Sequence, residues 1–206
     1  MPRADAARNR TLLLDAAAAE LSEHGLDVSI ARIAARAGVA KGTVFNHFPT
    51  KEDLVAAILA DQLGALATTA EALLDHADPQ AALLEFMTAG ADLQANDPAY
   101  CAAATAITRT HPAVRAASAR LARAAEALTA RARQSGAIRA DVTGHDVMLL
   151  LSAPTAIAAP VAAARPELRR RYLHLIFDGL RTEAAHELPV AAPTDQDFVA
   201  AATAAL

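Results

Sequence analysis

The chain has 206 residues, of which 54% are hydrophobic, 20% are charged and only 3% are aromatic, and its formal net charge is −4. This length suits one large domain or two smaller ones, and the negative charge argues against binding of nucleic acid by the whole surface. Alanine dominates the apolar fraction, and alanine is the strongest helix former, whereas strands favour β-branched and aromatic residues. The composition therefore predicts an all-α protein.

Charge is unevenly distributed along the chain. Residues 1–51 contain seven Lys or Arg and five Asp or Glu, a balance of +2, while the remainder carries twelve and eighteen, a balance of −6. A mildly basic N-terminal part is compatible with a local nucleic-acid surface. The single cysteine, Cys101, excludes an intrachain disulfide and suits a reducing compartment.

We expect a cytoplasmic protein without a membrane partner. Charged residues interrupt the apolar run at the N-terminus, which argues against a signal peptide. Residues 147–164 carry no charge, but they are largely alanine and include Pro154 and Pro160. A spanning helix needs about 20 strongly apolar residues, so this segment is expected to be a buried helix.

The first fifty residues predict three short helices. Apolar residues recur at helical spacing over residues 5–24. Ser29 is suited to cap a second helix, which Gly38 ends, and a third helix begins near Lys41 and stops before Pro49. Together these helices form an all-α head.

The remaining residues predict a larger helical body. Thr50 is expected to cap a long helix that begins at Lys51 or Glu52 and runs to about His76. Further helices are expected over residues 79–95, 98–110, 112–135, 143–163 and 166–187. We therefore divide the chain into a head at residues 1–50, a body at residues 51–188 and a partly ordered tail at residues 189–206.

The second and third helices form a helix-turn-helix candidate, because Gly38 tolerates the positive φ of the tight turn between them. At about 100° per residue, Val44 and Phe48 fall on one side of the third helix and define its packed face. The opposite side presents Gly42, Thr43 and Asn46, flanked by Phe45 and His47. Such side chains hydrogen-bond bases and phosphates, although residue types alone also fit an ordinary solvated helix.

The order of residues from Ser29 to Leu54, including AGVAKGTVFNHFPTKEDL, closely resembles the DNA-binding head of the tetracycline-repressor (TetR/AcrR) family of bacterial regulators. The resemblance covers about residues 8–58. It implies that Ser29 and Lys51 contact phosphates. It also implies that the groove-facing residues are Lys41, Gly42, Thr43, Asn46 and His47. The family usually has tyrosine at Phe45, so we expect Phe45 to contact a thymine methyl group or a sugar instead.

The resemblance further implies a homodimer that places two heads on a near-palindrome in double-stranded DNA. The family's interface is a four-helix bundle made by the last two helices of each subunit, here residues 143–163 and 166–187. The residues expected there are Val147, Leu150, Leu151, Ile157 and Val161. The alternative is that the helix at 143–163 belongs to the core of its own subunit.

No metal-ligand spacing, nucleophile elbow, phosphate loop or dinucleotide fingerprint stands out, so neither an enzyme nor a cofactor nor a metal is expected. The resemblance implies instead a pocket for a small-molecule effector of unknown identity in each body. Its candidate residues are Phe86, Met87, Asp92, Asn96, Tyr100, Thr105, Thr108, Arg109 and Met148. Binding there would reposition the helix that begins at Lys51.

The sequence thus favours a homodimeric transcriptional regulator, of the repressor kind that is most frequent in this family. It would bind a palindromic operator and be released by a small molecule. A helical enzyme or carrier with an incidental helix-turn-helix is the rival class, and it would need a cofactor motif in the body. A helical interaction module is the third, and it would lack salt-dependent affinity for duplex DNA.

Overall fold

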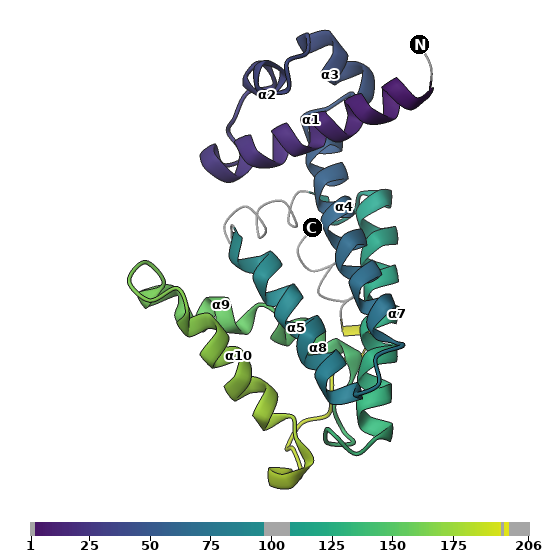
Figure 1. Ribbon diagram of the computed structural model, residues 1–206, viewed down its shortest axis with the longest axis vertical. Helices are drawn as coiled ribbons and strands as arrows, with labels where there is room; N and C mark the ends of the chain where they lie inside the picture. Colours follow the sequence, from purple (N-terminus) through teal and green to yellow (C-terminus); the bar gives the residue numbers. More distant parts are fainter. Residues whose placement is uncertain (1–2, 97–107, 195, 198–206) are drawn as a thin grey trace. The chain divides into compact units, whose positions relative to one another are not determined.

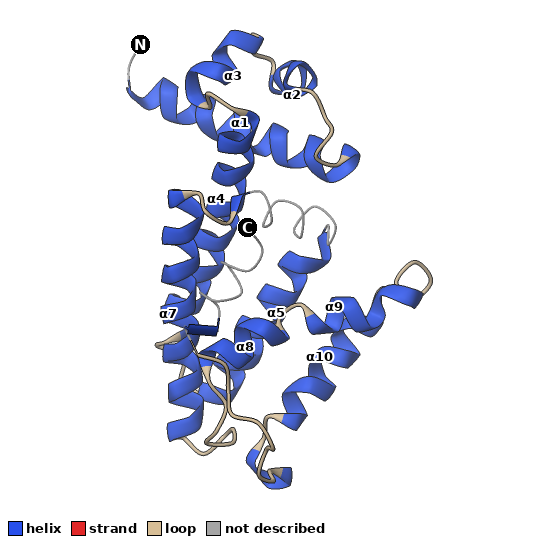
Figure 2. Ribbon diagram, turned by 180° about the vertical axis from the view of Figure 1, so that it is seen from behind, coloured by secondary structure: helices blue, strands red, loops and turns tan. Residues whose placement is uncertain are grey.

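The computed structural model describes residues 3–96, 108–194 and 196–197, and most of these residues are helical (Figures 1 and 2). The α-helices are α1 (Arg3–His24), α2 (Ile30–Ala37), α3 (Lys41–His47), α4 (Lys51–Leu73), α5 (Pro79–Asn96), α7 (Pro112–Gln134), α8 (Gly144–Leu150), α9 (Ala153–Ala158) and α10 (Leu168–Gly179). Two 3₁₀ helices follow α9 and α10, at Ala159–Val161 and Thr182–Ala184. The described residues contain no strand, only an isolated bridge between Ile138 and Arg181. The all-α prediction is confirmed.

The chain forms two compact units. The first contains Met1–Gly64 together with Asn96–Ala119, and the second contains Ala65–Ala95 together with Arg120–Leu206. Helices α4 and α7 therefore each contribute to both units. The division into a head at residues 1–50 and a body at residues 51–188 stays a prediction about function.

The first unit has its own hydrophobic core. Residues of α1 to α4 that are buried in it include Leu13, Leu21, Ile33, Val44, Phe48, Leu54 and Ile58. Val114, near the start of α7, is only 4% exposed and belongs to the same core. The packing of α1 to α3 is thus completed by a residue that is distant in the sequence.

Local signals set the ends of α2 and α4 as predicted. The Ser29 hydroxyl accepts a hydrogen bond from the Arg32 amide at 3.3 Å. Gly38 ends α2 with φ 68°, a left-handed conformation that glycine adopts without a steric cost. At α4, the Thr50 hydroxyl accepts from the Asp53 amide at 3.0 Å, while the Asp53 carboxylate accepts from the Thr50 amide at 3.0 Å. This reciprocal capping box fixes where α4 begins.

An ionic cluster that no local sequence pattern indicated joins α1 to α2. Glu20 of α1 is 5% exposed, and its carboxylate accepts hydrogen bonds from Arg32 at 2.6 Å and Arg36 at 3.2 Å. Burial alone would raise the pKa of the Glu20 carboxyl, but the two guanidinium groups hold it below its usual 4.5. A buried carboxylate with such partners orients α2, and hence α3, on α1.

Glu20→Gln is expected to lower the midpoint of thermal unfolding at neutral pH, because the variant leaves Arg32 without its carboxylate and Arg36 with Glu23 alone. The folded-state pKa of Glu20 is lowered, so its stabilising effect is present above about 4.5 and is lost as the pH falls through the folded value. The difference between variant and wild type should therefore shrink in acid. Circular dichroism melts from pH 3 to pH 7 measure this, with Glu85→Gln, an exposed carboxyl on α5, as control. A difference that stays constant with pH would contradict the assignment.

In the second unit, α7 packs along the end of α4. Arg120 of α7 binds the Glu71 carboxylate at 2.5 and 2.8 Å. Arg131 donates to the carbonyls of Leu73 at 3.3 Å and His76 at 2.9 Å, so it satisfies carbonyls at the end of α4. The prediction that this helix runs to about His76 is close, since α4 ends at Leu73.

The helix predicted at 143–163 is interrupted. It is divided into α8, α9 and a 3₁₀ turn, with a break at Leu151 and Ser152. Pro154 has no amide hydrogen to donate to a carbonyl four residues earlier, and its ring crowds that carbonyl; Pro160 repeats the effect one and a half turns later. A continuous helix over 143–163 is therefore a wrong prediction.

The last predicted helix, 166–187, is also shorter than expected. Helix α10 ends at Gly179, after which Arg181 is extended with ψ 156°. The Arg139 amide donates to the Leu180 carbonyl at 2.9 Å, and Ile138 bridges Arg181. This distant pairing pulls the chain out of the helix.

By length and composition alone, Lys51–Leu73 and Gly144–Val161 are apolar enough to cross a membrane. Buried helices of soluble proteins meet the same test, and half of the first window is buried within its fold. Most of the predicted helix at 98–110 lies outside the described residues, because residues 97–107 are not described. The tail from residue 198 onward also lies outside them.

Candidate DNA interface and effector site

Helix α3 has one buried face and one exposed face. Val44 is fully buried and Phe48 is 5% exposed, in the core of the first unit. Gly42 and Asn46 are exposed on the other side, and Phe45 is 41% exposed. The predicted groove-facing residues therefore lie on the solvent side of a helix that its own core holds in place, with Thr43 and His47 half-buried.

Cationic side chains lie against the aromatic residues of this helix. The Lys41 ammonium is 5.8 Å from the centre of the exposed Phe45 ring. The guanidinium of Arg10, from α1, is 5.4 Å from the Phe48 ring. Both distances are in the range of cation–π contacts. Arg10 was not among the residues singled out from the sequence, and its contact with Phe48 joins α1 to the end of α3.

The two predicted phosphate contacts flank the helix-turn-helix. Ser29 is exposed at the start of α2, where backbone amides point outward. Lys51 is half-buried at the start of α4, and its ammonium donates to the Leu26 carbonyl. Because an ammonium has three donors, this bond anchors Lys51 and leaves donor capacity for a phosphate.

The start of α4 is also linked to the start of α7. The Asp53 carboxylate accepts from the Thr50 hydroxyl at 2.7 Å and lies 3.4 Å from the His111 ring. The hydroxyl and the amide of Thr50, and then His111, hold the pKa of Asp53 below its usual 3.8. An ionised Asp53 therefore holds the first turn of α4, which carries Lys51.

One cluster has the residue types of a metal site. Glu20, Glu23 and His24 bring their ligand atoms within 4.8 Å of one another. Arg36 binds Glu23 at 2.8 Å, and Glu20 already binds two guanidinium groups. These cations compensate the carboxylates and disfavour a metal ion there.

The predicted effector residues fall on both units. In the second unit, Phe86 and Met87 are fully buried, Met148 is half-buried, and Asp92 binds Arg169 at 2.5 Å. Thr108 is fully buried and Arg109 half-buried in the first unit. The side chains of Asn96, Tyr100 and Thr105 lie outside the described residues.

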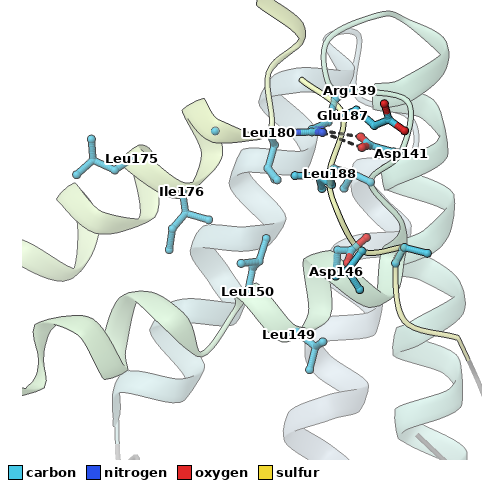
Figure 3. Close-up of a pocket in the computed structure, with 15 residues that line it drawn as sticks. Arg139, Asp141, Asp146, Leu149, Leu150, Leu175, Ile176, Leu180, Glu187 and Leu188 are labelled. Atoms are coloured by element: carbon cyan, nitrogen blue, oxygen red, sulfur yellow. Dashed lines mark hydrogen bonds and ion pairs between the residues drawn. The ribbon is translucent and has the colours of Figure 1, made fainter. Parts of the chain in front are cut away.

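The second unit contains a cavity of about 630 Å³ between α8, α10 and the segment after residue 186 (Figure 3). It is lined by Arg139, Asp141, Val142, Asp146, Leu149, Leu150, Leu175, Ile176, Gly179, Leu180, Glu187, Leu188, Val190, Ala191 and Ala192. Of the predicted effector residues whose side chains the structure describes, none lines it. Its walls come from four segments, at residues 139–142, 146–150, 175–180 and 187–192, so no local sequence pattern marked it.

The residues predicted for the dimer interface do not all reach the surface. Val147 of α8 and Leu151, in the break that follows α8, are buried within their own subunit, at 0% and 4% exposure. Their burial leaves these two side chains little surface for a second copy, and the dimer interface stays a prediction. Leu150 is half-buried, whereas Ile157 and Val161 are exposed. Leu149 and Leu175, which were not predicted, are also exposed, at 53% and 52%.

A short helix held by its core and presenting polar atoms, set between two candidate phosphate contacts, defines a helix-turn-helix transcriptional regulator. Residues 13–58 match the family model of bacterial regulatory proteins of the tetR family. Residues 78–182 match the C-terminal domain of SbtR-like transcriptional regulators. The chain belongs to the TetR family of transcriptional regulators, whose members bind DNA and respond to ligands. The family resemblance seen in the sequence is confirmed.

Solved structures agree with this assignment. A TetR regulatory protein from Mycobacterium vanbaalenii is 32% identical, with 87% of this chain and 99% of that chain covered and a TM-score of 0.64. The regulator SCO0520 from Streptomyces coelicolor is 29% identical over 85% and 99% of the two chains, with a TM-score of 0.66. FadR from Bacillus subtilis, solved in complex with stearoyl-CoA, shares the fold at 18% identity, with 83% and 99% coverage and a TM-score of 0.62.

Proposed function

We propose that this chain is a cytoplasmic homodimeric repressor that binds a palindromic operator and is released by a small molecule. The observation that carries the proposal is α3, whose Val44 and Phe48 are buried while Gly42 and Asn46 face solvent. A helix held in this way inserts its free face into a major groove. Asn46 supplies an amide that reads adenine, and Gly42 allows close approach of the backbone.

A single head reads only a few base pairs, so specificity needs two. The second unit exposes apolar side chains on α8, on α9 and the 3₁₀ helix that follows it, and on α10. A soluble monomer would leave them in water, and a second copy would bury them. They are Leu149, Ile157, Val161 and Leu175. A two-fold dimer that uses this face pairs the same surface with itself, and its operator carries the matching symmetry.

Release follows if the effector binds the DNA-free conformation more tightly than the DNA-bound one. Helix α4 begins with Lys51 and continues into the second unit, so it connects a DNA contact covalently to the body. The FadR structure with stearoyl-CoA supports an effector in this fold with a long apolar part. Within the second unit, the proposed pocket residues are Phe86, Met87, Asp92 and Met148.

Lys51→Ala is expected to weaken binding to every duplex and to flatten its salt dependence. Each phosphate contact contributes about 0.9 to the slope of log K against log salt, and the dimer would lose one contact in each half. Fluorescence anisotropy from 50 to 300 mM salt measures the slope. Arg123→Ala removes an exposed cation from α7 and serves as the control. An unchanged slope for Lys51→Ala would overturn the phosphate role.

Selection of bound sites from random duplex DNA tests the function as a whole. The expected result is enrichment of an inverted repeat whose half-sites lie about one helical turn apart, or a multiple of it. Absence of enrichment, together with absence of salt-dependent binding, would favour a helical interaction module. Reporter assays with the selected site, with and without the protein, would then decide the sign of regulation.

A further inference from the structure

The outward side of α10 carries a seam of four residues, Leu168, Tyr172, Leu175 and Gly179. Their spacing of four, three and four residues places them on one side of the helix. The opposite side, with Leu173 and Phe177 at 2% exposure, packs into the second unit. Leu175 is 52% exposed, and Gly179 is also exposed.

We propose that α10 pairs antiparallel with α10 of a second copy, and that two symmetric Arg171–Asp178 ion pairs set the register and select the partner. This inference rests on the proposed homodimer and adds to it the residues by which one copy recognises another. It commits to a second copy as the occupant of the seam, because the charges beside the seam complement one another only when the helix meets itself in reverse.

The seam residues fit this register. When Tyr172 lies opposite Leu175 of the partner subunit, the same two-fold operation places Leu168 opposite Gly179 of the partner subunit. A Cβ built on Gly179 meets nothing within 4 Å in its own chain, so there is room above it for a leucine side chain. The helix pair therefore has four layers of contacts. In two of them a leucine lies over a glycine, and in the other two a tyrosine meets a leucine.

The charges beside the seam make the same register favourable. Arg171 and Asp178 lie about two helical turns apart and so occupy the same flank of α10. In an antiparallel two-fold pair the axis is perpendicular to both helices, and each flank faces the identical flank of the partner. Arg171 then lies opposite Asp178 of the partner subunit, and the symmetry generates a second such pair. In a parallel pair this flank would face the other flank of the partner helix, so Arg171 and Asp178 would not meet.

Both charged side chains are available for this contact. Arg171 and Asp178 are exposed, and within the described part of the chain neither forms an ion pair. Neighbouring arginines differ in this respect, since Arg169 binds Asp92 and Arg165 binds Glu167. Charges beside an apolar seam contribute more to the choice of partner and orientation than to raw affinity, because like charges in the wrong pairing repel.

Charge reversal on the full-length chain tests the inference. Arg171→Asp alone, or Asp178→Arg alone, places like charges opposite each other twice in every homodimer. We expect each to raise the dimer dissociation constant roughly tenfold or more at low salt, by sedimentation equilibrium. An equimolar mixture of the two variants can form heterodimers with both pairs attractive, and it should dimerise like the wild type. The double variant should also recover.

Arg170→Asp is the matched control, because Arg170 is equally exposed but lies on another side of α10. Circular dichroism at equal concentration confirms that each variant is folded. If the variants dimerise like wild type, or if mixing does not restore dimers, the register is wrong while the homodimer stands. If the wild-type chain is a monomer at all concentrations tested, the proposed homodimer itself fails, and this inference with it.

Discussion

Asn46→Ala is expected to reduce the preference for the operator while leaving affinity for unrelated duplex DNA nearly unchanged. Asn46 is exposed on the free face of α3. In the major groove, an amide side chain can donate one hydrogen bond to N7 of adenine and accept one from its N6 amino group. Such a contact is worth about 1–3 kcal/mol of discrimination at each half-site. Non-specific binding depends on phosphates, which this substitution does not address.

Anisotropy titrations against the selected operator and a scrambled duplex of equal length measure the effect. The ratio of the two dissociation constants should fall for Asn46→Ala and remain nearly constant for Lys51→Ala, which weakens both. An equal loss on the two duplexes would show instead that Asn46 contacts the DNA backbone. Titrations at two salt concentrations separate the base contact from the phosphate contact, since only the latter changes the slope.

Gly144→Ala is expected to destabilise the second unit by about 3 kcal/mol, at the upper end of the usual cost of overpacking. A Cβ at this position would lie 2.7 Å from Cα and 2.8 Å from the backbone nitrogen of Glu126 in α7. Backbone cannot rotate away as a flexible side chain does. The Gly144 amide also donates to the Glu126 carboxylate at 2.6 Å, so any displacement of α8 costs this bond.

Gly64→Ala is the comparison for that variant. Gly64 lies inside α4, and a Cβ there meets nothing within 4 Å, so the alanine should be neutral or stabilising by up to about 1 kcal/mol. Urea unfolding at one fixed chain concentration measures both variants, because the stability of a dimer depends on concentration. A Gly144→Ala protein as stable as wild type would show that α8 can move away from α7 at little cost.

Features set by near neighbours were predictable from the sequence. Ser29, Gly38 and Thr50 act on amides or backbone angles within a few residues, and all three mark helix ends in the structure. Helical periodicity also predicted which face of α3 is buried, since Val44 and Phe48 fall on the same side. The free face of α3 could therefore be derived without any tertiary information.

Features set by distant neighbours were not predictable in this way. Glu20 is buried because two arginines of α2 reach it, and α10 ends early because the segment at 138–139 pairs with the residues that follow it. The break after α8 had a local cause in Pro154, yet the uncharged run around it still suggested a continuous helix. The cavity beside α10 combines four separate segments, so no single stretch of sequence carried its signal.

The burial of Val114 in the core of the first unit has a consequence for engineering and evolution. A chimeric regulator built by grafting residues 1–50, or even 1–64, onto a foreign body would lack this side chain and leave a void in the grafted core. Exchange of operator specificity between relatives then requires a matching first turn of α7 in the recipient. Recombination between two relatives at a single crossover after the head would separate Val114 from its core and destabilise the first unit. Compensating changes at the position of Val114 should therefore accompany successful exchanges.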